Sequence, residues 1–318
     1  MRELSDYSAV EWLKAEPLTH GFKRARNVAI ERLFRRKPAP GYDRFIADLK
    51  ARKPDTIGVV IAFNTPWAID LMTRIGKKNF VGTLVVCDNS RNPKARIEIE
   101  KICAERDVPY LALPHNPVRH PSRSHALSIN WVYYNVIDVV RPKVFGILDH
   151  DLFPLETLDF AAEVAYQPVY GERRPGARGW HLWAGFCVFD RAAIERSHPD
   201  FNTDTPRWLD SGGRNWVQIY SRLDEKRLRF SKSCLRLLRS PGFDEPRPIS
   251  MIDNCLHVIG ASYDVHANKS DTKAYIDGIV EYIEAGGEWT DLQVGDDLTE
   301  NAPIGGFFDA KHEMRGSV

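Results

Sequence analysis

An alternation of short apolar runs with helix-start signals is the strongest constraint on the fold of this chain. The apolar runs cover residues 57–63, 82–87, 109–113 and 143–148. Each run is apolar on both faces, as expected of a strand inside a parallel sheet. Thr-Pro at 65–66 and Asn-Pro at 92–93 each combine a capping residue with a proline at the first helical position, and a third helix is predicted over 123–140. The sequence therefore predicts an α/β fold with a doubly wound, mostly parallel, Rossmann-like sheet.

The remainder of the chain is less regular. Residues 1–53 are predicted to form a basic helical N-terminal extension, interrupted by Pro38, Pro40 and Gly41. After this extension we expect one domain in two halves, 54–165 and 166–290, followed by a C-terminal tail, 291–318. Within the second half we predict a loop at 167–179, strands at 180–189 and 255–260, and helices at 190–197, 212–223 and 270–284.

Composition narrows the possible classes of protein. With 318 residues, 43% of them hydrophobic, the chain is long enough to bury a large core. Its five cysteines contain no C-x-x-C pair, which favours reduced thiols and a cytoplasmic location. We find no apolar signal core and no run long enough to span a membrane.

The net charge of +1 conceals a local excess of positive charge. Residues 21–53 contain eleven Lys and Arg and three acidic residues, a net charge of +8 that the rest of the chain offsets with −7. The overall charge gives no nucleic-acid signal. Two interpretations of the basic segment remain open: a solvated helical face, or a surface that lies on anionic lipid at the inner membrane face.

Polar residues follow three of the predicted strands, at the sheet edge where α/β proteins bind ligands. They are Asn64, the sequence Asp-Asn-Ser at 88–90, and Asp-His-Asp at 149–151. Carboxylates at Asp149 and Asp151 suit Mg²⁺ or Mn²⁺, which prefer oxygen ligands. The alternative is that these two aspartates cap a helix expected after Pro154.

Residues 57–156 resemble the donor half of the GT-A glycosyltransferases, most closely those of the family 2 type. The resemblance rests on order and spacing: VVIAFN, VVCDNS, LPHN, SHALSINWVYYNV and FGILDHD follow one another along the chain. It covers about one third of the sequence. His150 between the two aspartates is a departure, at a position that tolerates variety.

The resemblance implies roles for several residues. Asp151 would bind the metal, Mn²⁺ or Mg²⁺, and Asp149 would lie near the metal or the ribose. Asp88 would contact the nucleotide base. The remaining residues implied to border the nucleotide or its phosphates are Phe63, Asn64, Arg123, His125 and Asn130. Residues 54–165 would then be the donor-binding half and 166–290 the acceptor-binding and catalytic half.

Three further candidates lie in the second half, each with a structural alternative. His257, in an H-x-x-G sequence, is expected to complete the metal site or else to be a packed core histidine; His266 is the weaker candidate for the same role. Gly185 is expected in the wall around the donor sugar, or in a strand that only packs the core. Asp210 is expected to act as the general base or as a helix N-cap.

These observations predict a metal-dependent glycosyltransferase. It would move a sugar from a nucleoside-diphosphate sugar to a glycan, a lipid-linked molecule or a protein; inversion and retention at the anomeric carbon both remain open. The alternatives are a non-catalytic nucleotide-sugar-binding protein and a sugar nucleotidyltransferase. The P-loop, dinucleotide, zinc-protease and α/β-hydrolase motifs are absent from the sequence.

Overall fold

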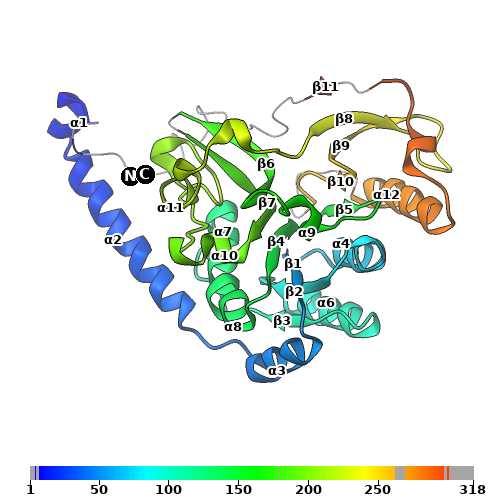
Figure 1. Cartoon of the computed structure of the whole chain (residues 1–318), viewed down its shortest axis with the longest axis horizontal. Helices are drawn as coiled ribbons and strands as arrows, with labels where there is room; N and C mark the ends of the chain where they lie inside the picture. Colours follow the sequence, from blue (N-terminus) through cyan, green and yellow to red (C-terminus); the bar gives the residue numbers. More distant parts are fainter. Residues whose placement is uncertain (1–3, 5–6, 178, 262–268, 297–298, 301–318) are drawn as a thin grey trace.

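A six-stranded sheet forms the centre of the molecule (Figure 1). The computed structural model describes residues 4, 7–177, 179–261, 269–296 and 299–300. The strands lie in the order β3-β2-β1-β4-β7-β6. Their bounds are β1 (Thr56–Ala62), β2 (Thr83–Asp88), β3 (Tyr110–Ala112), β4 (Val144–Asp149), β6 (Val169–Gly176) and β7 (Gly179–Asp190). Strands β1 to β4 pair in parallel and β7 runs antiparallel to both neighbours, which confirms the predicted α/β, mostly parallel sheet.

Helices cover both faces of this sheet, because β1 has apolar side chains on each face. Ile57, Val59 and Ile61 belong to one core cluster, and Val60 and Ala62 belong to the other. The first cluster is covered by α3 (Tyr42–Arg52), α7 (Pro121–Val132), its π-helical continuation η3 (Tyr133–Ile137) and α8 (Asp138–Val140). The second is covered by α4 (Pro66–Leu71), η2 (Met72–Gly76), α6 (Pro93–Glu105) and α9 (Phe160–Glu163), whereas the short α5 (Lys77–Asn79) has no buried residue.

A second sheet, which the sequence did not predict, has five strands in the order β11-β8-β9-β10-β5. They are β5 (Leu152–Pro154), β8 (Ser233–Leu238), β9 (Arg247–Ile252), β10 (Cys255–His257) and β11 (Thr299–Glu300). All of its pairs are antiparallel. β5 follows the central strand β4 after only two residues, so the second sheet extends from the same sheet edge that carries the Asp-His-Asp sequence.

Two of the predicted elements in the second half are wrong. The segment 167–179 contains β6 and the turn to β7, where we expected a loop. The predicted helix 212–223 is reduced to α11 (Asn215–Gln218) and a 3₁₀ turn, η6 (Tyr220–Arg222). The other short helices are α10 (Arg191–Ile194), η4 (Glu195–Ser197), η5 (Thr205–Arg207), η7 (Glu225–Arg227) and η8 (Trp289–Leu292).

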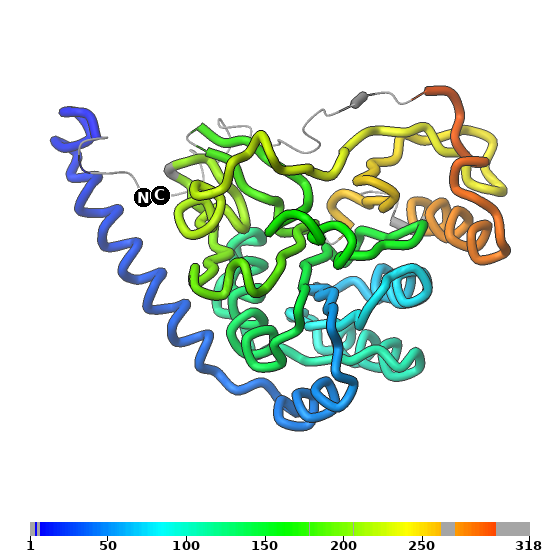
Figure 2. Tube along the Cα trace, in the orientation of Figure 1, coloured from blue at the N-terminus to red at the C-terminus, as the bar shows by residue number. Residues whose placement is uncertain are grey.

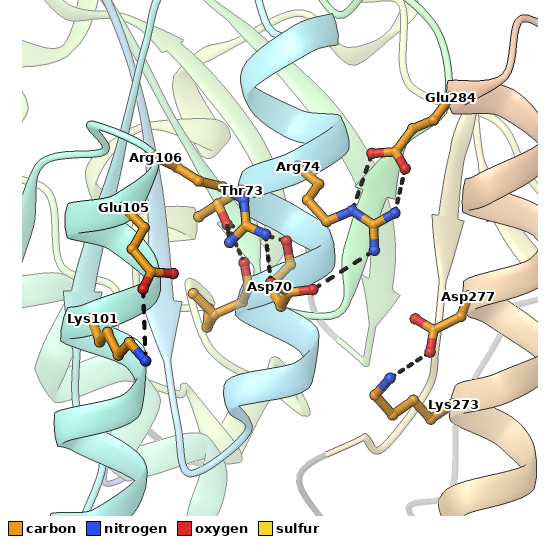
Figure 3. Close-up of polar contacts among 10 residues, drawn as sticks. Asp70, Thr73, Arg74, Lys101, Glu105, Arg106, Lys273, Asp277 and Glu284 are labelled. Atoms are coloured by element: carbon orange, nitrogen blue, oxygen red, sulfur yellow. Dashed lines mark hydrogen bonds and ion pairs between the residues drawn. The ribbon is translucent and has the colours of Figure 1, made fainter.

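A network of ion pairs joins the late helix α12 (Lys269–Glu284) to the first half of the chain (Figure 3). Arg74 contacts Glu284 of α12 and lies 3.8 Å from Asp70 of α4. Asp70 also accepts a 2.6 Å hydrogen bond from Arg106. The network therefore connects three helices on one face of the central sheet.

The N-terminal segment forms α1 (Ala9–Leu13) and α2 (Glu16–Arg35), and α2 runs along one flank of the molecule (Figures 1 and 2). α2 packs against α7. Among the described residues, no helix combines the length and the apolar character needed to cross a bilayer. All five cysteines are buried and none of them forms a disulfide.

Candidate metal and ligand site

A cavity of about 370 Å³ opens at the carboxyl ends of β1 and β4. Seven parts of the chain line it: the end of β1 with Phe63, Asn89 after β2, the segment from Arg119 into the start of α7, the residues 149–151, the β6–β7 hairpin, the loop at 210–211, and the segment 257–260. Its position is the one that ligands occupy in open α/β sheets.

Asp149 and His150 form a fixed ion pair in this cavity. Asp149 Oδ1 accepts hydrogen bonds from the His150 backbone N–H (3.0 Å) and from its Nδ1 (3.2 Å). The Thr65 hydroxyl donates its one hydrogen to the Phe63 carbonyl, so its 3.3 Å contact with His150 Nε2 requires the histidine to donate. Because both ring nitrogens of His150 then donate hydrogen bonds, the ring is in its protonated, imidazolium form.

The charges around His150 agree with this protonation state. Burial disfavours a charged ring, but the carboxylates of Asp151 and Asp149 outweigh it and raise the pKa of His150 to about 9. Burial would also raise the pKa of Asp149, yet its hydrogen bond to His150 and the neighbouring histidines hold that pKa well below its usual value. The pair is therefore ionised at neutral pH.

Asp151 is held by the second sheet. β5 begins at the next residue, and its antiparallel pairing with β10 puts His257 opposite Leu152. The Val258 N–H donates to the Asp151 carbonyl at 2.9 Å, and the Ala261 N–H donates to Asp151 Oδ2 at 3.2 Å. Burial and the charge of Asp149 raise the pKa of Asp151 to about 7.

The second oxygen of Asp151 fits a metal ligand. Asp151 Oδ1 is buried with no hydrogen-bond partner among the described residues, and it lies 3.7 Å from His257 Nε2. Two ligands of one Mn²⁺ or Mg²⁺ ion lie about 3–4 Å apart, given metal–ligand distances of roughly 2.0–2.6 Å. Burial lowers the pKa of His257 to about 4, so its ring is neutral and able to bind a metal.

Asp149, His150 and Asp151 each offer an atom within 4.8 Å of the others, a spacing that suits a metal. Both nitrogens of His150 already donate hydrogen bonds, however, so His257 is the better nitrogen ligand. The helix-cap alternative for the aspartates is wrong, because Asp159 caps the following helix α9. His266 lies outside the described residues.

Trp183 and Arg174 form one wall of the cavity. The Arg174 guanidinium lies 4.3 Å from the centre of the Trp183 ring, and Glu172 fixes it with two hydrogen bonds of 3.1 and 3.3 Å. The same Trp183 ring lies 5.1 Å from the His257 ring. Gly185 does not line the cavity; a Cβ atom there would lie 2.2 Å from Trp183, so the glycine makes room for this ring.

Asp210 and His125 also line the cavity. Asp210 Oδ1 and His125 Nε2 are both buried and have no hydrogen-bond partner among the described residues. Asp210 does not cap a helix, since α11 begins after Arg214. Burial lowers the pKa of His125, although the charges of Asp149 and Asp210 act in the opposite direction. Asp210 is thus an available carboxylate inside the cavity.

Asp88, predicted to contact the nucleotide base, lies away from the cavity lining. Its side chain is fully buried and does not line the cavity. One carboxylate oxygen accepts from the Ser90 N–H at 2.7 Å, and the other accepts from the Tyr110 hydroxyl at 2.9 Å. Asn89, its neighbour, lines the cavity instead and has a buried Oδ1 without a partner among the described residues.

Three other expected nucleotide contacts also lie outside the cavity lining, whereas Phe63 lies within it. Asn64 Oδ1 accepts from the backbone N–H groups of residues 91 and 92, which fixes the adjoining loop. Arg123 donates to Asn27 of α2 at 2.8 Å. Asn130 is buried and accepts from the Phe201 N–H at 2.8 Å. These residues organise the fold around the cavity.

Further residues that were not predicted as individual site residues contribute to the cavity lining, among them Arg119, Ser122, Ser124, Arg174, Trp183 and Ser211. Arg119 and Arg174 add positive charge to the lining, and that of Arg174 is paired with Glu172. The cavity thus combines buried acidic groups, the protonated His150, the neutral His125 and His257, and two arginines, a set that suits a polyanionic ligand held through a divalent cation.

Comparisons with known proteins add little to this description. No protein-family model matches the sequence, and no curated protein matches it. Among solved structures, the chain is similar to a mannosyltransferase from Pyrobaculum calidifontis in complex with GDP-mannose and Mn²⁺. The TM-score is 0.34 at 14% identity, over 54% of this chain and 55% of the other. A likeness of this size does not establish a shared family.

Proposed function

We propose that the protein is a metal-dependent glycosyltransferase with a GT-A type sheet, which moves a sugar from a nucleoside-diphosphate sugar to an acceptor hydroxyl. The observation that carries the proposal is the unpartnered Asp151 Oδ1 facing His257 in a cavity at the sheet's carboxyl edge. Asp149, Asp151 and His257 would hold Mn²⁺ or Mg²⁺. The bound ion would supply Lewis-acid and electrostatic stabilisation for a diphosphate leaving group.

The protein's own residues supply the remaining binding functions. Arg119 and Arg174 bring positive charge to a diphosphate as negative charge accumulates on it. Asn89 offers an unpaired amide oxygen for a nucleoside N–H or hydroxyl. Trp183 contributes apolar surface to the cavity lining, against which a sugar ring can pack.

Asp210 is the proposed general base. It removes the proton from the acceptor hydroxyl while that oxygen forms a bond to the anomeric carbon. The bond from this carbon to the diphosphate oxygen breaks at the same time, and the electron pair leaves with the nucleoside diphosphate. Displacement by an activated hydroxyl inverts the anomeric centre, so the available Asp210 carboxylate favours an inverting reaction.

A ligand screen followed by a turnover assay tests the proposal. We expect one nucleoside diphosphate to raise the melting temperature of the protein in the presence of Mn²⁺ and much less after chelation, since ligands that bind only the folded state stabilise it. We further expect release of nucleoside diphosphate from the matching sugar donor. Failure of every nucleoside diphosphate to bind would overturn the proposal; tight binding without any transfer would identify a non-catalytic binding protein.

A further inference from the structure

The exposed side of α2 carries an apolar stripe that the fold does not use. The stripe consists of Leu18, Phe22, Ala25, Ala29 and Leu33, all of them exposed. Their spacing of three or four residues puts them on one face of the helix. Leu18, Phe22 and Leu33 have 71%, 74% and 65% of their surfaces exposed. A contiguous apolar surface of this kind on a folded chain marks an interaction site.

The opposite face of α2 already has its partner inside the molecule. Phe34 is buried, and Ile30 packs against the same core cluster. Asn27 accepts a hydrogen bond from Arg123, and Glu31 accepts one from Asn202 at 2.7 Å. The helix is therefore anchored on α7 by one side, and the apolar stripe is left on its outer side.

The charge around the stripe indicates the chemistry of its partner. Arg26, Arg32 and Arg36 are exposed and, at the spacing of an α-helix, lie on or beside the stripe. The two acidic residues of α2, Glu16 and Glu31, are both half-buried, so the exposed charged residues of this helix are all basic. A second copy of the same face would bring arginines against arginines, which like-charge repulsion disfavours.

We propose that the outer face of α2 binds an anionic lipid surface, with the apolar stripe inserted between the headgroups and the arginines in contact with lipid phosphates. A twenty-residue helix is about 30 Å long and can lie flat in the interfacial layer. The proposed lipid contact does not depend on the chemistry in the cavity. The lipid-binding face and the cavity are nevertheless connected in the structure, since α2 packs on α7, whose first turn lines the cavity.

Vesicle flotation of the full chain tests this surface. The probes are vesicles of phosphatidylcholine alone and of phosphatidylcholine mixed with phosphatidylglycerol. We expect the protein to float with the mixed vesicles, to remain unbound with the neutral ones, and to bind more weakly as salt is added, because surface charge is screened. Absence of flotation with the mixed vesicles overturns the proposal.

Two pairs of variants separate the contributions of the stripe and the charges. Leu18→Ser with Phe22→Ser should weaken vesicle binding at least about tenfold through lost apolar burial. Its control is Ile97→Ser, another exposed apolar side chain, on α6. Arg26→Glu with Arg32→Glu should also weaken vesicle binding at least about tenfold, because basic residues near an anionic surface attract it and acidic ones are repelled. Its control is Lys78→Glu, at an exposed position of α5.

Matched melting curves establish that all variants fold. Equal vesicle binding by the stripe variant and its control contradicts the proposal. Light scattering after gel filtration covers the remaining case: if the protein is a dimer that the stripe variant converts to a monomer, the stripe is an interface between copies and the lipid proposal is wrong.

Discussion

Oδ1 of Asp151 faces Nε2 of His257 at 3.7 Å, although the two residues are separated by more than a hundred positions in the sequence. The contact follows from the pairing of β5 with β10, which sets His257 opposite the residue after Asp151. The distance is too long for a hydrogen bond and suits two ligands of one ion. The second sheet is therefore what completes the candidate metal site.

Removing either ligand should weaken metal binding without unfolding the protein. Asp151→Asn keeps an oxygen to accept from Ala261 but removes the negative charge. We expect Mn²⁺ to raise the melting temperature of the unmodified protein and to have almost no effect on this variant. His257→Gln should lower Mn²⁺ affinity by about tenfold or more. His115→Gln, at an exposed position outside the cavity, is the control. Equal Mn²⁺ affinity in all four proteins would remove both residues from the site.

Asp210→Asn tests the proposed base. The substitution keeps the size of the side chain and removes its ability to take a proton. We expect kcat to fall by about 10²–10⁴-fold, the usual contribution of a general base. The affinity for nucleoside diphosphate should be unchanged, because the base acts on the acceptor. A variant that transfers sugar at the full rate would show that another group accepts the proton.

Gly185→Ala tests the packing of Trp183. The added methyl group would lie 2.2 Å from the indole, so the ring must leave its position between Arg174 and His257. We expect a loss of about 1–3 kcal/mol in unfolding free energy, as for other overpacked cores, and weaker binding of the sugar donor. Gly21→Ala, a helical position with no atom near the new methyl, should instead stabilise by about 0.5–1 kcal/mol. Denaturant unfolding measures both changes.

The sequence predicted the central sheet well because β1, β2 and β4 are buried on both faces and read as unbroken apolar runs. β6 was missed for the opposite reason. It is the edge strand of its sheet, and its end, with Arg173, Arg174 and Pro175, is partly exposed. Such an edge tolerates charge and proline, which in a sequence indicate a loop. β8 and β9 pair with each other as neighbours in the chain, but both are only partly buried and so lack the unbroken apolar run that marks a central strand.

The candidate site was predicted in part. The rule that polar residues at strand ends approach a ligand led to Asp149 and Asp151, both in the cavity. It did not distinguish Asp88 from Asn89, because adjacent residues of an extended chain point in opposite directions. On α7 the side of the helix decides which residues reach the ligand. Ser122 and His125 face the cavity, whereas Arg123 faces α2. Only the packing of the helix decides which of its sides faces the ligand.

Substitutions at these two neighbours should therefore have different effects. Asn89→Ala removes the unpaired oxygen in the cavity and should weaken nucleoside-diphosphate binding by about 1–3 kcal/mol. Asp88→Ala removes the acceptor for Ser90 and Tyr110 and should lower the unfolding free energy by a similar amount. Calorimetric titration and denaturant unfolding of both variants give the comparison. A loss of affinity in the Asp88 variant alone would instead support the prediction that Asp88 contacts the nucleotide base.

Glu31 on α2 should make the stability of the protein depend on pH. Burial and the charge of Asp200 raise the pKa of this carboxyl, although a hydrogen bond from Asn202 acts in the opposite direction. The folded state therefore holds the proton more tightly than the unfolded chain. As pH rises from the unfolded value of 4.5 through the raised pKa, the folded state loses stability relative to the unfolded state.

Glu31→Gln removes this titration while keeping an oxygen to accept from Asn202. We expect the variant to gain stability relative to the unmodified protein as pH increases from about 4 to 8. This range begins near the ordinary pKa of a glutamate and extends above it, where a carboxyl with a raised pKa ionises. Glu98→Gln, at an exposed position of α6, is the control and should show no such trend. Denaturant unfolding at several pH values measures the difference. If the difference in unfolding free energy between Glu31→Gln and the unmodified protein is the same at every pH, Glu31 has the same pKa in the folded and unfolded chains. Its burial against α7 would then not disfavour the ionised carboxylate.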